Sequence, residues 1–346
     1  LETVTLRQHA AAKFSRAAAM FFTRPALEQA SGEAVAAYRA RRFARLGAEW
    51  VADLGCGIGG DALALAAHAQ VIGIDRDEVR LGMAQANVSA YGCDGRFHPV
   101  QADLTDLPPL PVDALFFDPA RRDTHGRRLF SVSDYRPPLS LIDGWRQRVP
   151  HTAVKISPGV DYAELPPDAE VEFISMKGEV KEAVLWFGGL GSAVARRATL
   201  LPGGNTLTTN DLPEGETAVT PPQSFLYEPD KAIIRAHLVE ALAARLNAAK
   251  ISPDIAYLTG ETAVAAPFAR CFLIESVMPF QLKRLRQHLR QNRIGQVIIK
   301  KRGSPLQPDQ LRQQLRLKGD KQRILFLTQV MGEAAVIITH PPIPSP

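Results

Sequence analysis

Four aspartates in the first 118 residues each follow a short apolar run that is typical of a buried β-strand. They are Asp53, Asp75, Asp103 and Asp118. The carboxyl ends of parallel strands meet at one edge of a sheet, and open α/β sheets bind ligands at that edge. We therefore predict that the four carboxylates line one ligand site, although an aspartate in such a position can instead cap a helix. For Asp61 and Asp106 we prefer the helix cap.

A glycine-rich turn follows the first of these aspartates, ahead of a helix-forming run at 62–67. Its glycines are Gly55, Gly57, Gly59 and Gly60. A backbone without Cβ atoms can approach a ligand closely at the start of a helix. The spacing Gly55-x-Gly57-x-x-Gly60 fits the dinucleotide fingerprint, so the turn predicts a nucleoside cofactor without choosing which one. Asp75, or its neighbour Asp77, is then placed to accept hydrogen bonds from the ribose hydroxyls.

The elements around these residues alternate between strand and helix, which predicts a parallel sheet covered by helices. Strands are expected at 49–54, 70–75, 96–102, 112–117 and 152–156, and helices at 60–68, 77–91 and 137–148. Two further strand-like runs, 170–176 and 183–188, are separated by a gap too short for a crossover helix, so we expect them to be antiparallel. A dinucleotide-binding domain would stay parallel, and this difference argues against NAD.

The pattern Asp53-x-Gly55-x-Gly57-x-Gly59 and the antiparallel end of the sheet resemble the class I S-adenosylmethionine (SAM) methyltransferases, over residues 50–190. The resemblance implies an α/β fold. It would be a Rossmann-like seven-stranded sheet with an antiparallel last strand, preceded by a helical N-terminal region and followed by a small α/β domain. It also implies SAM as the cofactor. In that family the three acids corresponding to Asp53, Asp75 and Asp103 lie near the methionine amino group, the ribose hydroxyls and the adenine amino group, respectively.

The run Asp118-Pro119-Ala120-Arg121 resembles the fourth motif of amino-methylating nucleic-acid methyltransferases, (Asp/Asn/Ser)-Pro-Pro-aromatic. There the carboxylate and the proline carbonyl accept hydrogen bonds from an exocyclic amine and orient its lone pair toward the methyl group. These catalytic roles carry over to Asp118 and Pro119, but the aromatic residue is replaced by Arg121. A guanidinium can stack on a base or hold a phosphate, so we expect Arg121 and Arg122 to bind substrate. The alternative is a solvated charged loop.

The stretch 276–308 contains no aspartate or glutamate. Its basic residues are Lys283, Arg284, Arg286, Arg290, Arg293, Lys300, Lys301 and Arg302. Charge of one sign on a small module is typical of nucleic-acid binding, so we predict that Lys300, Lys301 and Arg302 contact RNA. A solvated face is the alternative. Residues 272–339 resemble the THUMP-like domain that accompanies some bacterial class I methyltransferases, and THUMP domains occur in RNA-modifying enzymes.

The chain of 346 residues is long enough for two domains, and its net charge of +5 hints at an acidic partner. We predict five parts: a helical N-terminal region at 1–48, a SAM-binding methyltransferase domain at 49–199, a linker with a connecting helix at 200–250, a basic THUMP-like α/β domain at 251–340 and a disordered tail at 341–346. Within the first part we expect a helix at 28–45, whose clustered arginines suit the negative end of its dipole.

The longest apolar stretch, 183–195, is too short to span a bilayer, and no basic-then-apolar signal segment opens the chain. Cys56, Cys93 and Cys271 lie far apart and lack the spacing of a metal site. We therefore predict a cytoplasmic protein with no membrane contact and no metal.

These patterns together predict a SAM-dependent methyltransferase that acts on a nucleotide of RNA, with a base amine as one candidate acceptor. The basic C-terminal domain would present the substrate. Two alternatives stay open at this point. One is a methyltransferase of small molecules, and the other is an RNA-binding adaptor with a vestigial SAM site.

Overall fold

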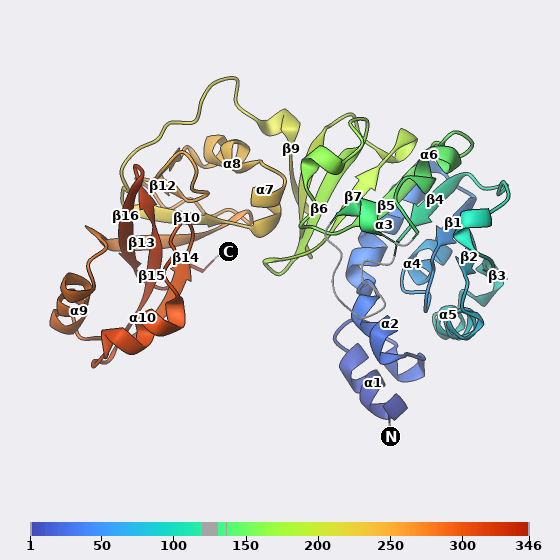
Figure 1. Cartoon of the computed structure of the whole chain (residues 1–346), viewed down its shortest axis with the longest axis horizontal. Helices are drawn as coiled ribbons and strands as arrows, with labels where there is room; N and C mark the ends of the chain where they lie inside the picture. Colours follow the sequence, from blue (N-terminus) through green and yellow to red (C-terminus); the bar gives the residue numbers. More distant parts are fainter. Residues whose placement is uncertain (1, 120–130, 136, 345–346) are drawn as a thin grey trace. The chain divides into compact units, whose positions relative to one another are not determined.

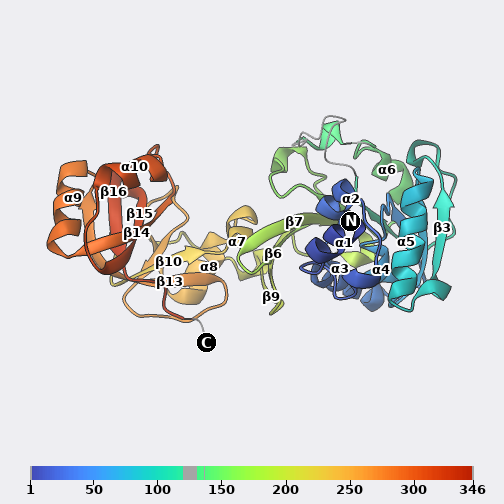
Figure 2. The same ribbon diagram turned by 90° about the horizontal axis from the view of Figure 1, so that it is seen from below.

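A computed structural model describes residues 2–119, 131–135 and 137–344 (Figure 1). Ala120, Arg121 and Arg122 therefore lie outside the described residues, and their predicted roles stay predictions. The chain divides into two compact units, Leu1–Gly204 and Asn205–Pro346 (Figure 2).

The first unit is built on a mixed sheet whose strand order is β3-β2-β1-β4-β5-β7-β6-β8. Its strands are β1 (Trp50–Leu54), β2 (Gln70–Asp75), β3 (Phe97–Gln101), β4 (Ala114–Phe117), β5 (Thr152–Ile156), β6 (Glu170–Met176), β7 (Glu179–Trp186) and β8 (Arg196–Leu201). Strand β7 is antiparallel to β5 and β6, whereas the other pairings in this series are parallel. This confirms the predicted class I methyltransferase sheet over β1 to β7. The prediction of seven strands was too low, because β8 and then β9 (Asn205–Thr208) extend the order beyond β6.

Adjacent residues of the central strands face opposite sides of the sheet, and each side is covered by helices. Phe116 lies in the core shared with α3 (Glu33–Leu46), α4 (Ala62–Ala66) and α5 (Glu78–Ala90). Phe117 meets Trp145 of α6 (Leu141–Arg146) edge-on, with 5.2 Å between ring centroids. The alternation follows from the two-residue repeat of a strand, and it explains why β4 is apolar throughout.

The N-terminal region contains α1 (Glu2–Ala10) and α2 (Arg24–Gln29) before α3. The predicted helix at 28–45 was wrong at its start, because the chain leaves α2 and enters α3 through Gly32. The Lys13 ammonium closes the end of α2 by donating to the carbonyls of Leu27 and Ala30, at 2.6 and 3.1 Å. The segment between the two helices is thereby held in a defined position.

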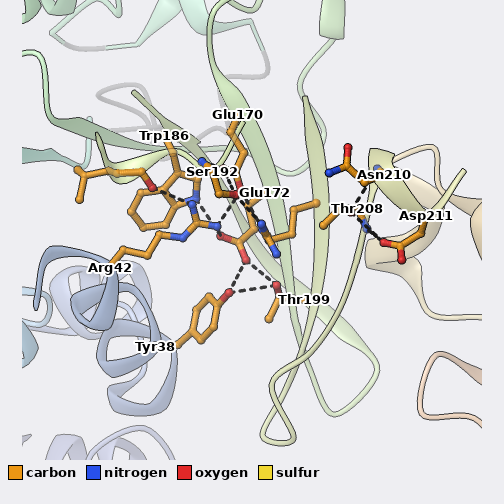
Figure 3. A network of polar contacts seen from close by, with 12 residues as sticks. Tyr38, Arg42, Glu170, Glu172, Trp186, Ser192, Thr199, Thr208, Asn210 and Asp211 are labelled. Atoms are coloured by element: carbon orange, nitrogen blue, oxygen red, sulfur yellow. Dashed lines mark hydrogen bonds and ion pairs between the residues drawn. The ribbon is translucent and has the colours of Figure 1, made fainter. Parts of the chain in front are cut away.

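A buried polar network joins α3 to the antiparallel end of the sheet (Figure 3). The Arg42 guanidinium donates to Glu170 and Glu172, at 2.8 Å each, and lies 4.3 Å from the Trp186 ring centroid. Tyr38 donates to Glu172 at 2.6 Å. The arginines of α3 were predicted to serve the helix dipole, and for Arg42 that was wrong, because its side chain is committed to acids of β6.

Glu170 gathers several donors in this network. It accepts hydrogen bonds from Arg42, from Arg197 of β8 and from Ser192, at 2.7 to 2.8 Å. Burial alone would raise the pKa of Glu170, but the hydrogen bond and charge of Arg42, together with the other donors, lower it to about 2. A carboxyl group whose pKa is depressed by folding stabilises the fold above its ordinary pKa, and that stabilisation is lost as the pH falls.

We expect Glu170→Gln to lower the free energy of unfolding at pH 7 by about 3 kcal/mol, the linkage value for a pKa moved from about 4.5 to about 2. The loss of stability between pH 4.5 and 2 should also become shallower, because the variant no longer takes up that proton. Urea denaturation at a series of pH values measures both effects. Glu179→Gln is the matched control, since Glu179 pairs with Lys181 on the surface. An acid slope equal to that of the wild type would contradict the assignment.

The second unit contains another mixed sheet, in the order β11-β12-β10-β13-β16-β15-β14. Its strands are β10 (Phe225–Pro229), β11 (Ala249–Lys250), β12 (Leu258–Gly260), β13 (Ala269–Pro279), β14 (Ile294–Lys301), β15 (Lys321–Val330) and β16 (Glu333–Thr339). Its helices are α7 (Lys231–Arg235), α8 (Val239–Leu246), α9 (Leu282–Gln291) and α10 (Pro308–Leu315). The segment 200–250 was predicted as a linker, but it contains β10, which pairs with both β12 and β13.

Two separate cores lie on the two faces of β15. Leu325 and Leu327 pack with α9 and α10, whereas Ile324 and Phe326 pack with residues such as Tyr257.

The prediction of a disordered tail at 341–346 was wrong in part, because the Ile343 amide donates to the Cys271 carbonyl at 2.9 Å. In the part of the chain that the structure describes, no helix combines the length and apolarity needed to cross a membrane.

Candidate functional site

The carboxyl edge of the first sheet brings together β1, β2 and β4 with the glycine turn. Gly55, Gly57 and Gly59 have φ values of 79, 54 and 81°, in the left-handed region that favours glycine. A Cβ atom on Gly55 would lie 3.3 Å from the backbone carbonyl oxygen of Asp118. The turn thus runs close against the end of β4 because it carries no side chain at this point.

Asp53 is buried at the end of β1, and its Oδ2 atom has no hydrogen-bond partner among the described residues. Burial raises the pKa of Asp53 well above its usual range, and the negative charges of Asp61 and Asp118 raise it further. A buried carboxylate without a partner is costly. The position is therefore suited to a ligand that brings a positive charge.

Asp75 and its neighbour Asp77 have different tasks. Asp75 accepts hydrogen bonds from the Gly57 amide at 2.9 Å and from the Asp77 amide at 3.0 Å, so it is tied to the glycine turn. Asp77 caps α5 by accepting from the amides of Val79 and Arg80. Because the Asp77 side chain is occupied by this cap, the predicted contact with the ribose hydroxyls rests on Asp75, and it stays a prediction.

Asp103 is exposed after β3, and it caps a short turn. It accepts from the Thr105 amide at 2.8 Å and from the Thr105 hydroxyl at 2.7 Å. These hydrogen bonds lower its pKa. Both the cap and the predicted cofactor contact are compatible with this position, so its role toward a ligand stays a prediction.

Asp118 is paired with a lysine that the sequence analysis did not single out. Lys155 of β5 donates to Asp118 Oδ2 at 2.5 Å and to the Ser31 hydroxyl at 2.9 Å. The parallel register of β4 and β5 explains this contact. Phe117 of β4 lies opposite Val154 of β5, so the residues that follow them, Asp118 and Lys155, are also neighbours. The available signal was a lysine inside the otherwise uncharged strand Thr152–Ile156.

Arg39 of α3 joins the same cluster from the N-terminal side. Its guanidinium donates to Asp61, to Glu182 of β7 and to the Ser31 hydroxyl. Burial alone would lower the pKa of Arg39, but the charges of Asp61 and Glu182 raise it instead. The expected capping role of Asp61 was wrong, because its side chain makes no cap hydrogen bond to α4.

The basic residues predicted to contact RNA differ in how they are presented in the second unit. Lys300 pairs with Glu228 and lies over the rings of Phe272 and Phe326, and Arg302 donates to a backbone carbonyl and lies 4.5 Å from the Tyr257 ring centroid. Lys301 is exposed and donates to a glutamine side chain. Within the stretch 276–308, the exposed basic side chains without a hydrogen bond or ion pair to any described residue lie on α9, and they are Lys283, Arg284 and Arg290.

Comparison with known proteins agrees with this architecture. Residues 51–118 match a family model described as a methyltransferase domain, and residues 269–341 match one described as THUMP domain-like. The fold and the site at the sheet edge define a class I methyltransferase.

The chain is 38% identical over 343 residues to an S-adenosylmethionine-dependent methyltransferase of Mycobacterium tuberculosis strain CDC 1551 / Oshkosh, with 95% of this chain and 92% of the relative covered. The same values hold for the protein of strain ATCC 25618 / H37Rv. A crystal structure of a methyltransferase from Porphyromonas gingivalis W83 has the same fold, with a TM-score of 0.81, 23% identity and coverage of 97% of this chain and 88% of that one. The chain belongs to this family of SAM-dependent methyltransferases.

The residues at the sheet edge fit SAM. The methionine part of SAM carries an ammonium group, which matches the unpartnered and buried Oδ2 atom of Asp53. The glycine turn allows the backbone to come close to the cofactor, and Asp75 is held by the amide of that same turn.

We expect Asp53→Asn to weaken SAM binding by about 1.5–3 kcal/mol, the range for a hydrogen bond to a charged group. In the wild type, affinity should rise with pH above the usual range of a carboxyl group, because the raised pKa of Asp53 means that a proton must leave before the ammonium group is bound. The variant should show no such dependence. Calorimetry in two buffers of different ionisation enthalpy measures both the affinity and the released protons.

The control for this experiment is Asp77→Asn, which preserves the cap on α5 because asparagine caps equally well. Its SAM affinity and pH dependence should equal those of the wild type. If Asp53→Asn keeps the wild-type affinity and proton release, Asp53 does not bind the ammonium group.

Proposed function

We propose that this enzyme transfers the methyl group of SAM to a nucleotide of RNA. The observation that carries the substrate class is the exposed basic face of α9, within the THUMP domain-like segment 269–341. Leu285 and Leu289 of α9 are fully buried in the core, so Lys283, Arg284 and Arg290 are left on its outer side. Basic side chains without acidic partners suit phosphate groups.

We propose that Asp53 binds the amino group of SAM, that Asp75 binds its ribose hydroxyls, and that Asp103 contacts its adenine. SAM supplies a methyl group already activated by the sulfonium. The protein then needs to place the nucleophile in line with the carbon–sulfur bond, and positioning of this kind can supply most of the rate acceleration. We assign that task to Asp118 and to the Pro119 carbonyl, at the end of β4. Support comes from the position of Asp118 beside the glycine turn.

The proposed partner is RNA, and Arg121, Arg122 and Lys301 remain proposed substrate contacts. Lys300 and Arg302 are engaged within the second unit, so they are less suited than Lys301 to hold a phosphate. We also propose a cytoplasmic location, which agrees with the three unpaired cysteines.

Asp118→Ala should leave SAM affinity within about two-fold of the wild type while slowing methyl transfer by about two to three decades, a reasonable scale for one lost positioning contact. An interaction made mainly in the reactive geometry is lost from kcat rather than from binding. Single-turnover transfer of tritium from SAM to RNA measures the rate, and the parallel affinity shows that the site is still folded. Methylation at the wild-type rate would mean that another residue orients the acceptor.

Replacement of Lys283, Arg284 and Arg290 by Glu should weaken RNA binding and flatten its dependence on salt, by about 0.7 for each lost single-strand phosphate contact. The matched control reverses Arg24, Arg41 and Arg45, which are exposed on α2 and α3 of the first unit. Filter binding over a series of salt concentrations gives both slopes. An unchanged slope in the α9 variant, with intact SAM binding, would favour a small-molecule substrate instead.

A further inference from the structure

Lys155 is a charged residue in a strand that is buried along its whole length. Its side chain is only 3% exposed, and its ammonium donates to Asp118 Oδ2 and to the Ser31 hydroxyl. A buried ammonium group is costly unless it is paired and hydrogen-bonded. The three side chains therefore hold one another in place.

Asp118 is the member of this trio that reaches the surface of the site. Its side chain is 21% exposed, whereas Lys155 lies beneath it and Ser31 is buried. Lys155 is thus placed to act through Asp118 rather than by touching a substrate.

Charged groups on three elements of the described chain interact with Asp118. One is an acid, Asp53 of β1, which itself lies near Asp61. Two are cations, Arg39 of α3 and Lys155 of β5. The Arg39 guanidinium is already committed to carboxylates of Asp61 and Glu182. Lys155 donates a hydrogen bond directly to the Asp118 carboxylate and balances its charge, whereas Arg39 acts on Asp118 through longer-range attraction.

We propose that Lys155 is a positioning residue for methyl transfer, which keeps the Asp118 carboxylate charged and fixed at the end of β4, and that Ser31 fixes Lys155 in turn. This inference rests on the proposed role of Asp118 toward the nucleophile. In that reaction the lone pair of the acceptor nitrogen forms a bond to the methyl carbon, and the carbon–sulfur bond breaks with its electron pair moving to sulfur. The proton released from the methylated amine passes to the Asp118 carboxylate or to water.

The first arm of the test measures Asp118 itself. Carbon-13 NMR titration of the aspartate carboxyl groups in the full chain follows its protonation, with the signal assigned by its loss in Asp118→Ala. In Lys155→Met the titration midpoint of Asp118 should rise by about 1–3 pH units, the usual effect of removing an adjacent opposite charge. Lys155→Arg retains the charge and should stay close to the wild type. Lys181→Met, which removes a lysine paired at the surface, should leave the midpoint unchanged.

The second arm measures the pH dependence of methyl transfer. The substrate is total RNA from a strain that lacks this gene, and the readout is tritium transferred from SAM. In Lys155→Met, the pH midpoint of the acid limb of the rate profile should rise by the same amount as the titration midpoint of Asp118. The SAM affinity should stay within about two-fold of the wild type. If Lys155→Met does not fold, Lys155→Gln provides the same comparison with a polar side chain.

The outcomes separate this inference from the proposed function. An Asp118 midpoint that does not move overturns the role of Lys155, whatever the enzyme methylates. A midpoint that moves while the rate profile stays fixed overturns the role of Asp118 toward the nucleophile, and the positioning role of Lys155 falls with it. Matching upward shifts in both arms for Lys155→Met, with no shift for Lys155→Arg or Lys181→Met, support the inference.

Discussion

The arrangement of the site depends on one buried guanidinium, that of Arg39. A fully buried cation needs carboxylate partners, and Arg39 takes one from each side of the sheet edge: Asp61 beside the glycine turn and Glu182 on β7. Because Arg39 belongs to α3, these ion pairs also fix the N-terminal helices to the sheet. Ser31, just before α3, is placed by the same contacts and in turn meets Lys155. The N-terminal region therefore borders the candidate site, since Ser31 contacts Lys155 of β5 and Arg39 contacts Glu182 of β7.

The site contains more carboxylates than its buried cations can neutralise, and this charge balance affects which form of the cofactor suits the site. Arg39 and Lys155 lie among Asp61, Glu182, Asp118 and Asp53, and Asp53 is left with a raised pKa. SAM bears a net positive charge that its demethylated product lacks. Such a site is electrostatically suited to the methyl donor over the spent product, which favours turnover. The Asp53 oxygen without a hydrogen-bond partner among the described residues fits this interpretation, because buried polar groups are normally satisfied.

Much of this architecture could be predicted from the sequence, because it depends on local patterns. The alternation of apolar strands and helices, the glycine spacing and the short connection at 177–178 were sufficient for β1 to β7 and for the elements of 269–341. The contacts of Arg39 and Lys155 could not be predicted, because their carboxylate partners lie 22 to 143 residues away and meet only through the packing of α3 and the register of the strands. Strand β10 was missed for a similar reason, since its pairing with β12 and β13 is formed by distant segments. The exposure of Lys301 beside the engaged Lys300 likewise depends on which face of β14 is covered.

We propose above all that this SAM-dependent methyltransferase acts on RNA. The most direct measurement incubates the purified full chain with tritiated SAM and an extract of a strain that lacks the gene, followed by separation of RNA, protein and small molecules. We expect label in RNA, removed by ribonuclease and recovered as a methylated nucleoside. Label confined to protein or to small molecules would contradict it.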